Sequence, residues 1–340
     1  MTTPPGVRRP VTAREVAARA GCSTATVSLV VNGKADGRVT AAKQEQVWAA
    51  VRELDYRVHT AASRLATGNP GNVVFVSPDP TNPFFSLLLE GLLEGLDDRL
   101  SLSLVAPRGG DDYDSPTVRR AQSGDAAALV LASPGDDVVR DLRTGRPVIL
   151  IDAGVRLDGA SSIDVDVAEA GRLLANHLVD LGHRRVAYVG VDRDKRTLRR
   201  RREHLSAQLR QRGAQLVAPD LAVARMTMDA AHRAALASLD RWIQAGVTAV
   251  VCADDLLAFG VLRAARDRGI SVPAELSIAG FNDMPYAGMV SPSLTSVDLR
   301  ARDLGRGTAA LLTELFDDGR VTSTVISPGL KVRESTGPVR

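Results

Sequence analysis

Residues 11–32, VTAREVAARAGCSTATVSLVVN, predict two short helices joined by a tight turn. Thr12 can cap the first helix through its hydroxyl, and Glu15, three residues later, completes a capping box. Gly21 supplies the backbone freedom that a sharp turn requires, and Ser23 can cap the second helix. Helices joined in this way place the second helix in the DNA major groove. An ordinary helical hairpin is the alternative on spacing alone.

Small apolar side chains give this helix pair an inner face. The first helix offers Val16, Ala17 and Ala20, and the second, from Thr24 to about Val31, offers Val27, Val30 and Val31. A third helix is expected from about Thr40, because Val47, Val51 and Leu54 keep helical spacing. The three helices together predict a small folded unit with its own core.

Charge is unevenly spread along the 340 residues. Residues 1–70 hold ten Lys and Arg against five Asp and Glu, whereas the remainder holds 33 against 35. A basic N-terminal unit on a near-neutral body is typical of a nucleic-acid-binding module attached to a larger domain. The length of the chain predicts two or three domains, and its hydrophobic content of 44% is ample for their cores.

Signals for export, for a membrane span and for a metal site are missing from the sequence. The N-terminus, MTTPPGVRRP, lacks the apolar region of a signal peptide, and no segment approaches the ~18 uninterrupted apolar residues of a membrane span. Cys22 and Cys252 lie in unrelated segments, without metal-ligand neighbours at a useful spacing. We therefore expect a soluble cytoplasmic protein that holds no metal or cofactor.

The pattern changes after the Gly68, Asn69, Pro70 and Gly71 break, the clearest domain boundary in the chain. Short apolar runs then alternate with amphipathic stretches, at 73–77, 102–106, 128–132, 147–152, 185–190, 249–253 and 276–281. Such runs indicate strands buried on both faces of parallel α/β sheets, and their number fits two doubly wound lobes better than one sheet. Ligands of such sheets bind beyond the carboxyl ends of the strands, here in a cleft between the lobes.

An ordered set of motifs extends from Val11 to about Gly337. After the opening stretch come LDYRVHTAASRLATG (54–68), PDPTNPFF (78–85), VILID (148–152), LGHRRVAYVG (181–190), ADDLLAFGVLRAARDRGISVPAELSIAGFNDMP (253–285), SPSLTSV (291–297) and LGRGTAALL (304–312). With these motifs in this order, the chain resembles the LacI/GalR family of bacterial transcriptional regulators.

The resemblance implies an α/β protein with an N-terminal helix-turn-helix head and a two-lobed, periplasmic-binding-protein-like core of doubly wound parallel sheets. A homodimer would read a pseudo-palindromic operator on nucleoid DNA, under the control of a small molecule bound in the cleft. The expected parts are a disordered arm (1–10), the head (11–57), a hinge helix and linker (58–70) and the core (71–335). Within the core we expect lobe one at 71–163 and 296–322, and lobe two at 164–291 and 323–335.

The resemblance also implies which residues contact DNA. Thr24 and Ala25 occupy the base-reading positions at the start of the second helix, while Thr26 and Ser28 fit phosphate contact through their hydroxyls. Further contacts are expected at Thr12, Ser23, Asn32, Lys34 and Arg38, although a solvated loop is the alternative for the last two.

Two departures from the family pattern bear on DNA recognition. Leu29 stands where many members carry an arginine for guanine, and a leucine cannot make that bidentate contact. We therefore expect Leu29 to contact a thymine methyl group, with loss of base readout at this position as the alternative. Leu65 aligns with the leucine that wedges into the minor groove, with Ala62 small enough to lie against the groove floor. Packing within the linker is the alternative for Leu65.

The second departure from the family pattern lies in the hinge. Val58 and His59 replace the usual Pro-Asn start of the hinge helix, which makes its initiation less favourable.

Four polar residues match effector-contacting positions of the family, namely Asp152, Arg201, Asp254 and Asn282. Asp152 ends an apolar run, where side chains point into the cleft. Asp254 and Asn282 exchange the usual places of an amide and a carboxylate. A carboxylate, a guanidinium and an amide suit a polyhydroxy ligand such as a sugar or sugar derivative. A purine or another small metabolite is the alternative.

Three other residues accompany this polar set. Phe84 and Phe85 are expected to cover the apolar face of the ligand, with core packing as the alternative for each. Met226 stands where relatives often place an aromatic side chain, so close stacking on a sugar is not expected there. Around Arg201, the run RDKRTLRRRREH (193–204) is expected to be mostly a solvated helix face.

The competing interpretations are an enzyme and a solute-binding protein on the same core. The sequence contains no GxxxxGK[ST] phosphate loop, no GxSxG elbow and no HExxH pair. The adjacent Asp254 and Asp255 would point in different directions at a strand end, so they are not expected to act as a catalytic pair. A solute-binding protein would have no use for a basic head. An allosteric repressor without enzymatic activity is therefore the leading hypothesis.

Overall fold

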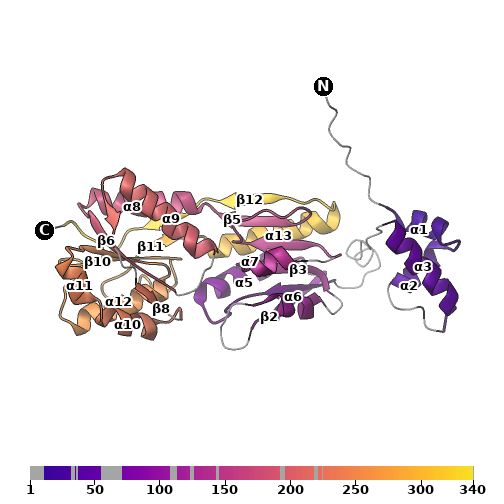
Figure 1. Cartoon of the computed structure of the whole chain (residues 1–340), viewed down its shortest axis with the longest axis horizontal. Coiled ribbons are helices and arrows are strands. Elements are labelled where there is room, and N and C mark those ends of the chain that lie inside the picture. Colours follow the sequence, from indigo (N-terminus) through magenta and orange to yellow (C-terminus); the bar gives the residue numbers. More distant parts are fainter. Residues whose placement is uncertain are drawn as a thin grey trace, which may run out of the picture.

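The computed structural model describes residues 11–31, 35, 37–54, 71–107, 113–122, 126–142, 145–191, 196–217, 221–223 and 225–339. Three helices form the N-terminal head, α1 (Ala13–Arg19), α2 (Thr24–Val31) and α3 (Ala41–Glu53). They form a body with its own core, separate from the two lobes that make up the rest of the molecule (Figure 1).

The head folds for the local reasons that its sequence predicts. Glu15 N donates to Thr12 Oγ1, and Thr12 N donates to Glu15 Oε2 at 2.6 Å, which confirms the capping box. Ser23 Oγ accepts from Thr26 N at 3.1 Å at the start of α2. Gly21 in the turn has a φ of +59°, a conformation that favours glycine. The small core contains the predicted apolar face, with Val16, Ala17, Ala20, Val27, Val30, Val47 and Ala50 buried.

Lobe one is built on a six-stranded parallel sheet with the strand order β12-β5-β4-β3-β1-β2. The strands are β1 (Gly71–Val76), β2 (Leu100–Val105), β3 (Ala126–Ala132), β4 (Val148–Ile151), β5 (Ser161–Val165) and β12 (Ser323–Ile326). The helices are α5 (Pro83–Gly95), α6 (Ser115–Gln122), α7 (Asp136–Asp141) and α13 (Ala301–Asp317). The central strand β3 is buried along its whole length, as a strand covered on both faces must be.

Lobe two has a seven-stranded sheet with the order β13-β11-β10-β9-β6-β7, in which β8 also pairs with β6. Its strands are β6 (Arg185–Val191), β7 (Gln215–Leu216), β8 (Leu221–Val223), β9 (Ala249–Cys252), β10 (Ser277–Phe281), β11 (Thr295–Asp298) and β13 (Gly329–Lys331). Its helices are α8 (Val167–Asp180), α9 (Arg196–Gln211), α10 (Met228–Leu236), α11 (Leu239–Gln244) and α12 (Asp255–Asp267). All pairings are parallel except that of β11 with β13. The prediction of two doubly wound lobes is confirmed.

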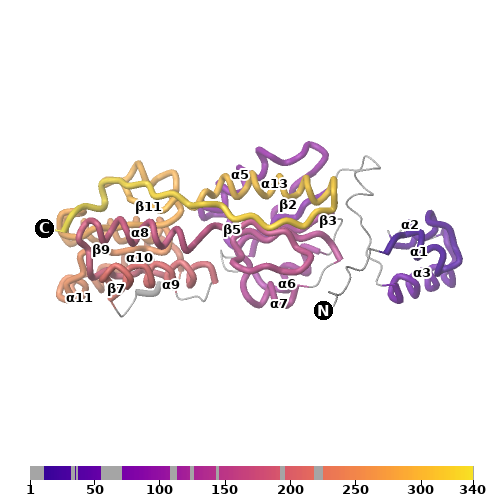
Figure 2. Tube along the Cα trace, turned by 90° about the horizontal axis from the view of Figure 1, so that it is seen from above, coloured from indigo at the N-terminus to yellow at the C-terminus, as the bar shows by residue number. Residues whose placement is uncertain are grey.

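The chain crosses between the lobes at other residues than those predicted. β5 extends to Val165, so 164–165 belong to lobe one. β11 pairs with β10, which places 296–298 in lobe two rather than lobe one. β12 pairs with β5 in lobe one, although we expected 323–335 in lobe two. The last segment passes from one lobe to the other (Figure 2). These boundaries depend on strand pairing, which four-residue segments do not reveal in the sequence.

The C-terminal segment completes lobe two beyond the predicted end of the core at residue 335. Gly337 O lies 3.1 Å from His183 Nε2, and Gly337 N donates to Ser277 Oγ at 3.1 Å. Burial lowers the pKa of His183 from its usual value. Cys252 is buried and Cys22 is half-buried. In the part of the chain that the structure describes, no helix is both long and apolar enough to span a membrane.

Candidate functional site

The first turn of α2 presents small polar side chains to solvent. Thr24, Ala25 and Ser28 are exposed, whereas Thr26 and Leu29 are half-buried. The Thr26 hydroxyl lies 3.0 Å from Ser23 Oγ. The first turn carries no acidic residue, so the partial positive charge of the helix N-terminus remains available to an anion. This surface has the chemistry of the predicted DNA-contacting face, and the individual contacts stay predictions.

A lysine that sequence reasoning missed holds the turn between α1 and α2. Lys43 Nζ, on α3, donates to Gly21 O at 3.3 Å and to Ala20 O at 3.4 Å. Thr12 and Arg38 are exposed on the same head. The remaining predicted DNA contacts and hinge residues lie outside the described residues, namely Asn32, Lys34, Val58, His59, Ala62 and Leu65.

Asp152 and Arg201 meet between the lobes. Asp152 directly follows β4 of lobe one, and Arg201 lies on α9 of lobe two. Arg201 Nη2 donates to Asp152 Oδ2 at 3.3 Å, and both side chains are 4% exposed. Ser133 Oγ, after the neighbouring strand β3, donates to the same carboxylate oxygen at 3.4 Å. Asp152 has a φ of +48° and Ser133 a φ of +43°, a rare conformation that clusters at functional sites.

Asp254 is the centre of a second polar group between the lobes. Its Oδ1 accepts from Leu256 N at 2.8 Å and so caps α12. Its Oδ2 accepts from Asn282 Nδ2 at 2.8 Å and from Asn82 Nδ2, in lobe one, at 3.2 Å. Asn282 also has a positive φ, of +106°. The structure therefore brings together Asp254 and Asn282, two of the four residues predicted to contact the effector.

Asn82 is a site residue that sequence reasoning did not identify. Its Oδ1 accepts from Phe84 N at 2.9 Å and caps α5, while its amide reaches Asp254 and, at 3.6 Å, Met226 Sδ. The Asn-Pro pair in PDPTNPFF predicts a helix start, because asparagine favours the cap and proline the first turn. Only the packing of the lobes shows that the same side chain bridges them.

Burial controls the charge of the paired carboxyl groups at the start of α12. It raises the pKa of Asp254 to about 6, despite the hydrogen bonds that favour the carboxylate. Burial also raises the pKa of Asp255 well above its usual value. Asp255 accepts from Ser296 Oγ at 2.7 Å and from Met284 N at 2.8 Å within lobe two. The two carboxyl groups therefore point apart, as predicted, and Asp255 has a structural role.

Two buried polar atoms of the cleft have no hydrogen-bond partner among the described residues, Arg201 Nε and Asn282 Oδ1. Such groups are costly to bury without a partner. One is a donor and the other is an acceptor, so a bound molecule with hydroxyl groups can satisfy both. The four predicted polar residues thus lie in two interlobe clusters with unused hydrogen-bonding capacity.

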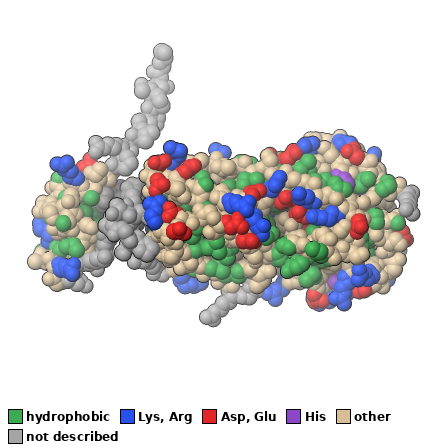
Figure 3. Space-filling model, turned by 180° about the vertical axis from the view of Figure 1, so that it is seen from behind, with side chains coloured by type: hydrophobic (Ala, Val, Ile, Leu, Met, Phe, Trp, Pro, Cys, Tyr) green, Lys and Arg blue, Asp and Glu red, His purple; other side chains and the backbone are tan. Residues whose placement is uncertain are grey.

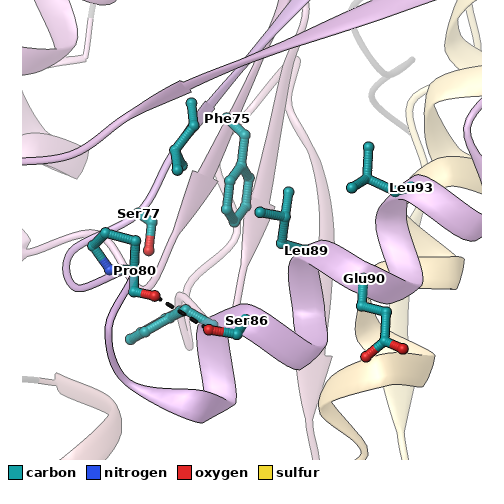
Figure 4. A pocket seen from close by; sticks show the side chains of 9 residues that line it. Phe75, Ser77, Pro80, Ser86, Leu89, Glu90 and Leu93 are labelled. Atoms are coloured by element: carbon teal, nitrogen blue, oxygen red, sulfur yellow. Dashed lines mark hydrogen bonds between the residues drawn. The ribbon is translucent and has the colours of Figure 1, made fainter.

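The two phenylalanines lie on the lobe one side of this site. Phe84 is 4% exposed in the main core and contacts Phe85 edge-to-face, with ring centroids 5.2 Å apart. Phe85 lines an apolar pocket of about 300 Å³ on lobe one, which none of the cleft residues lines. Figure 4 shows that Phe75, Leu89 and Leu93 belong to the same pocket. The geometry favours core and surface packing, the alternative left open for both rings.

The basic run on α9 differs from the expected solvated face. Arg196 pairs with Asp136 of lobe one at 2.6 Å, and Arg200 Nη1 donates to Gly154 O of lobe one at 2.9 Å. Arg199 Nη2 also lies 3.8 Å from Asp136 Oδ2, so with Arg201 four arginines of α9 reach across the lobe boundary. The physical reason is that successive turns of α9 lie against the start of α7 and the loop that follows β4. Sequence spacing alone cannot show what the basic face meets.

Family comparisons cover both the head and the core. Residues 12–58 match the family "Bacterial regulatory proteins, lacI family", and residues 175–336 match "Periplasmic binding protein-like domain". The HTH-type transcriptional regulator MalR of Streptomyces coelicolor is 32% identical over 343 residues, covering 95% of each chain. The maltose regulon regulatory protein MalI of Escherichia coli is 29% identical over 310 residues, covering 87% of this chain and 89% of its own.

Solved structures agree with the fold over almost the whole chain. A transcriptional regulator CelR–cellobiose complex has a TM-score of 0.66 and 26% identity, and covers 96% of this chain and 100% of its own. The lac repressor dimer bound to operator and an anti-inducer has a TM-score of 0.67 and 23% identity, with coverage of 97% and 100%. The similarity therefore spans head and core together, in the same order along the chain.

Proposed function

Because this chain belongs to the LacI family of bacterial transcriptional regulators, we propose that it is a repressor that a sugar or sugar derivative controls. The family consists of DNA-binding regulators with an effector domain, not of enzymes, so the head binds DNA and the core binds an effector. The finer proposal is that two copies bind a pseudo-palindromic operator and that the ligand lies between the lobes.

The hydrogen-bonding groups in the cleft are the basis for the proposed ligand class. Arg201 Nε needs an acceptor and Asn282 Oδ1 needs a donor, and one hydroxyl group can supply either role. Asp152 and Asp254 add carboxylate acceptors, which are suited to further hydroxyl groups. Cellobiose in the CelR complex supports a carbohydrate. A purine would favour an aromatic side chain to stack on. At the position where relatives often have one, this chain has the half-buried Met226.

The polar contacts between the lobes suggest how a ligand would act. Asn82 bonds to Asp254 and Asp152 bonds to Arg201, so the lobes are joined directly at the proposed ligand positions. A ligand that binds there must replace or extend these bonds. It shifts the lobes only if it binds one arrangement more tightly than the other. That difference in affinity is the free energy available to alter operator binding.

Exposed apolar side chains support a homodimer. Leu93 is 54% exposed and Leu104 is 46% exposed on lobe one, while Tyr286 and Met289 of lobe two are 59% and 85% exposed. Hydrophobic side chains gather on both lobes of one face (Figure 3). Exposed apolar surface of this kind is what a protein–protein interface would bury. A two-fold dimer would present two heads to two half-sites of an operator.

Selection of genomic DNA fragments by the purified full-length protein tests the proposal. We expect enrichment of a pseudo-palindrome, and a sugar related to the neighbouring genes should change the affinity for it. Release from DNA would identify an inducer, and tighter binding a co-repressor. No enriched site, with or without a panel of neutral sugars, would contradict the proposal. Analytical ultracentrifugation of the same sample tests the dimer.

A further inference from the structure

The start of α9 carries a cluster of arginines that is unfavourable for the helix itself. Four of them lie within its first two turns, namely Arg196, Arg199, Arg200 and Arg201. The first turn holds no acidic residue. Positive side chains near a helix N-terminus oppose the partial positive charge of the helix end, and like charges three or four positions apart repel each other. The position of the four arginines therefore lowers the stability of α9 unless partners outside the helix offset it.

Lobe one supplies a partner for each of these arginines. Arg196 Nη2 lies 2.6 Å from Asp136 Oδ1, and Arg199 Nη2 lies 3.8 Å from Asp136 Oδ2. The other two contact Gly154 O and Asp152, as described above. The side chains of Asp136 and Arg196 are 39% and 23% exposed, so this pair lies at the edge of the lobe boundary.

Asp136 is a single carboxylate shared by two arginines of the other lobe. An isolated surface ion pair contributes little to stability, whereas several charges that form a network contribute more. When the lobes separate, Arg196 and Arg199 lose this carboxylate and are left beside each other at the unfavourable end of their helix. The charges at this edge therefore favour the arrangement in which the lobes are in contact.

We propose that Asp136, Arg196 and Arg199 form an electrostatic latch that holds the two lobes together on the α9 side. Arg201 and Asp152 are each 4% exposed, so access to them improves when the lobes separate. The latch thereby controls ligand entry to the cleft, a consequence that rests on the proposed function. The lobe contact itself should depend on ionic strength, because the Debye length falls from about 10 Å at about 0.1 M salt to about 3 Å at about 1 M.

Fluorescence energy transfer across the lobe boundary tests the latch. Dyes on Arg119→Cys, in α6 of lobe one, and on Gln211→Cys, at the end of α9, occupy exposed positions. Figure 2 shows α6, α7 and α9 on one side of the molecule. A Cys22→Ser background leaves the buried Cys252 as the remaining native thiol. An excess of unlabelled full-length protein suppresses transfer between copies.

Without ligand, we expect transfer in the protein with an intact latch to fall as salt rises from about 0.1 M to about 1 M. Asp136→Asn should lower the transfer already at low salt and remove at least half of its salt dependence. Asp136→Lys should lower it further, because it replaces attraction by repulsion. In both variants Asp137 keeps an acidic side chain in the first turn of α7. Asp180→Asn is the matched control, since Asp180 pairs with Arg212 at the same 2.6 Å but within lobe two.

Two results would overturn the proposal. One is an Asp136→Asn protein with unchanged transfer and unchanged salt dependence, and the other is an equal change in Asp180→Asn. Thermal melting curves verify that each variant is folded. The measurement uses neither DNA nor sugar, so the latch can fail while the proposed function holds, and the proposed function can fail while the latch holds.

Discussion

Asn82 Nδ2 lies 3.2 Å from Asp254 Oδ2, and this hydrogen bond joins the start of α5 in lobe one to the start of α12 in lobe two. Asn82 also caps α5 through its amide oxygen Oδ1, and Asp254 caps α12 through its other carboxylate oxygen Oδ1. The same two side chains therefore fix the starts of two helices and hold the two lobes together. A ligand that displaces this contact acts directly on the position of two helices.

Asn82→Ser tests this bridge. Serine keeps an oxygen that can cap α5 but loses the amide that reaches Asp254. Since hydrogen bonds to charged groups contribute about 1.5–3 kcal/mol, we expect the lobes to separate more readily. Small-angle X-ray scattering should show a larger radius of gyration without ligand. An unchanged scattering profile, together with an unchanged melting temperature, would argue against the bridge.

Arg201→Lys tests the sugar cleft. Lysine keeps the positive charge near Asp152 but removes the Nε donor that has no partner in the described structure. We expect the affinity for the responding sugar to fall at least tenfold, while operator affinity without sugar changes by less than about threefold. Arg202→Lys, on the exposed side of α9, is the matched control. Sugar binding of wild-type strength in Arg201→Lys would remove Arg201 from the site.

The raised pKa of Asp254 predicts a pH dependence of stability. The folded chain holds this proton up to a pH of about 6, whereas the ordinary pKa is 3.8. The folded state therefore binds the proton more tightly than the unfolded state, and this group adds stability as the pH falls from about 7 to about 4. Urea unfolding across this range should show that Asp254→Asn loses that component. Parallel pH profiles for the two proteins would contradict it.

Gly305→Ala tests the close approach of α5 and α13. A Cβ at residue 305 would lie 2.1 Å from Leu88 O and 2.5 Å from Leu92 N, both of them backbone atoms. The helices would have to move apart, which costs about 1–3 kcal/mol in comparable overpacked sites. We expect a lower melting temperature. Gly288→Ala is the control, because its nearest neighbour would lie 3.8 Å away, and an equal loss there would refute the explanation.

Leu65→Ala tests the hinge contact that the family resemblance implies. An inserted leucine unstacks a base step at the operator centre, so its loss should weaken operator binding more than non-specific binding. Fluorescence anisotropy with an operator duplex and with a scrambled duplex measures both affinities at one salt concentration. Equal losses on the two duplexes would show that Leu65 packs in the linker instead.

Local sequence determined the head and most strands of the core. Thr12, Glu15 and Ser23 act within three residues of themselves, so their capping bonds follow from spacing alone. The strands around Leu129, Ile149 and Val251 were predictable because a strand buried on both faces has to be apolar throughout. Short or half-exposed strands such as β12 carried no such signal, and the predicted lobe boundaries were wrong there.

The cleft was predictable only in part. Asp152, Arg201, Asp254 and Asn282 could be named from motif positions, whereas the bridging role of Asn82 and the interlobe arginines of α9 could not. The physical reason is that capping and strand burial depend on neighbours in the chain. Contacts such as Asn82 with Asp254, which are 172 positions apart, depend on how two separately folded lobes pack. The sequence by itself determined the head, most strands of the core and the family, and the tertiary structure decided which side chains face each other across the cleft.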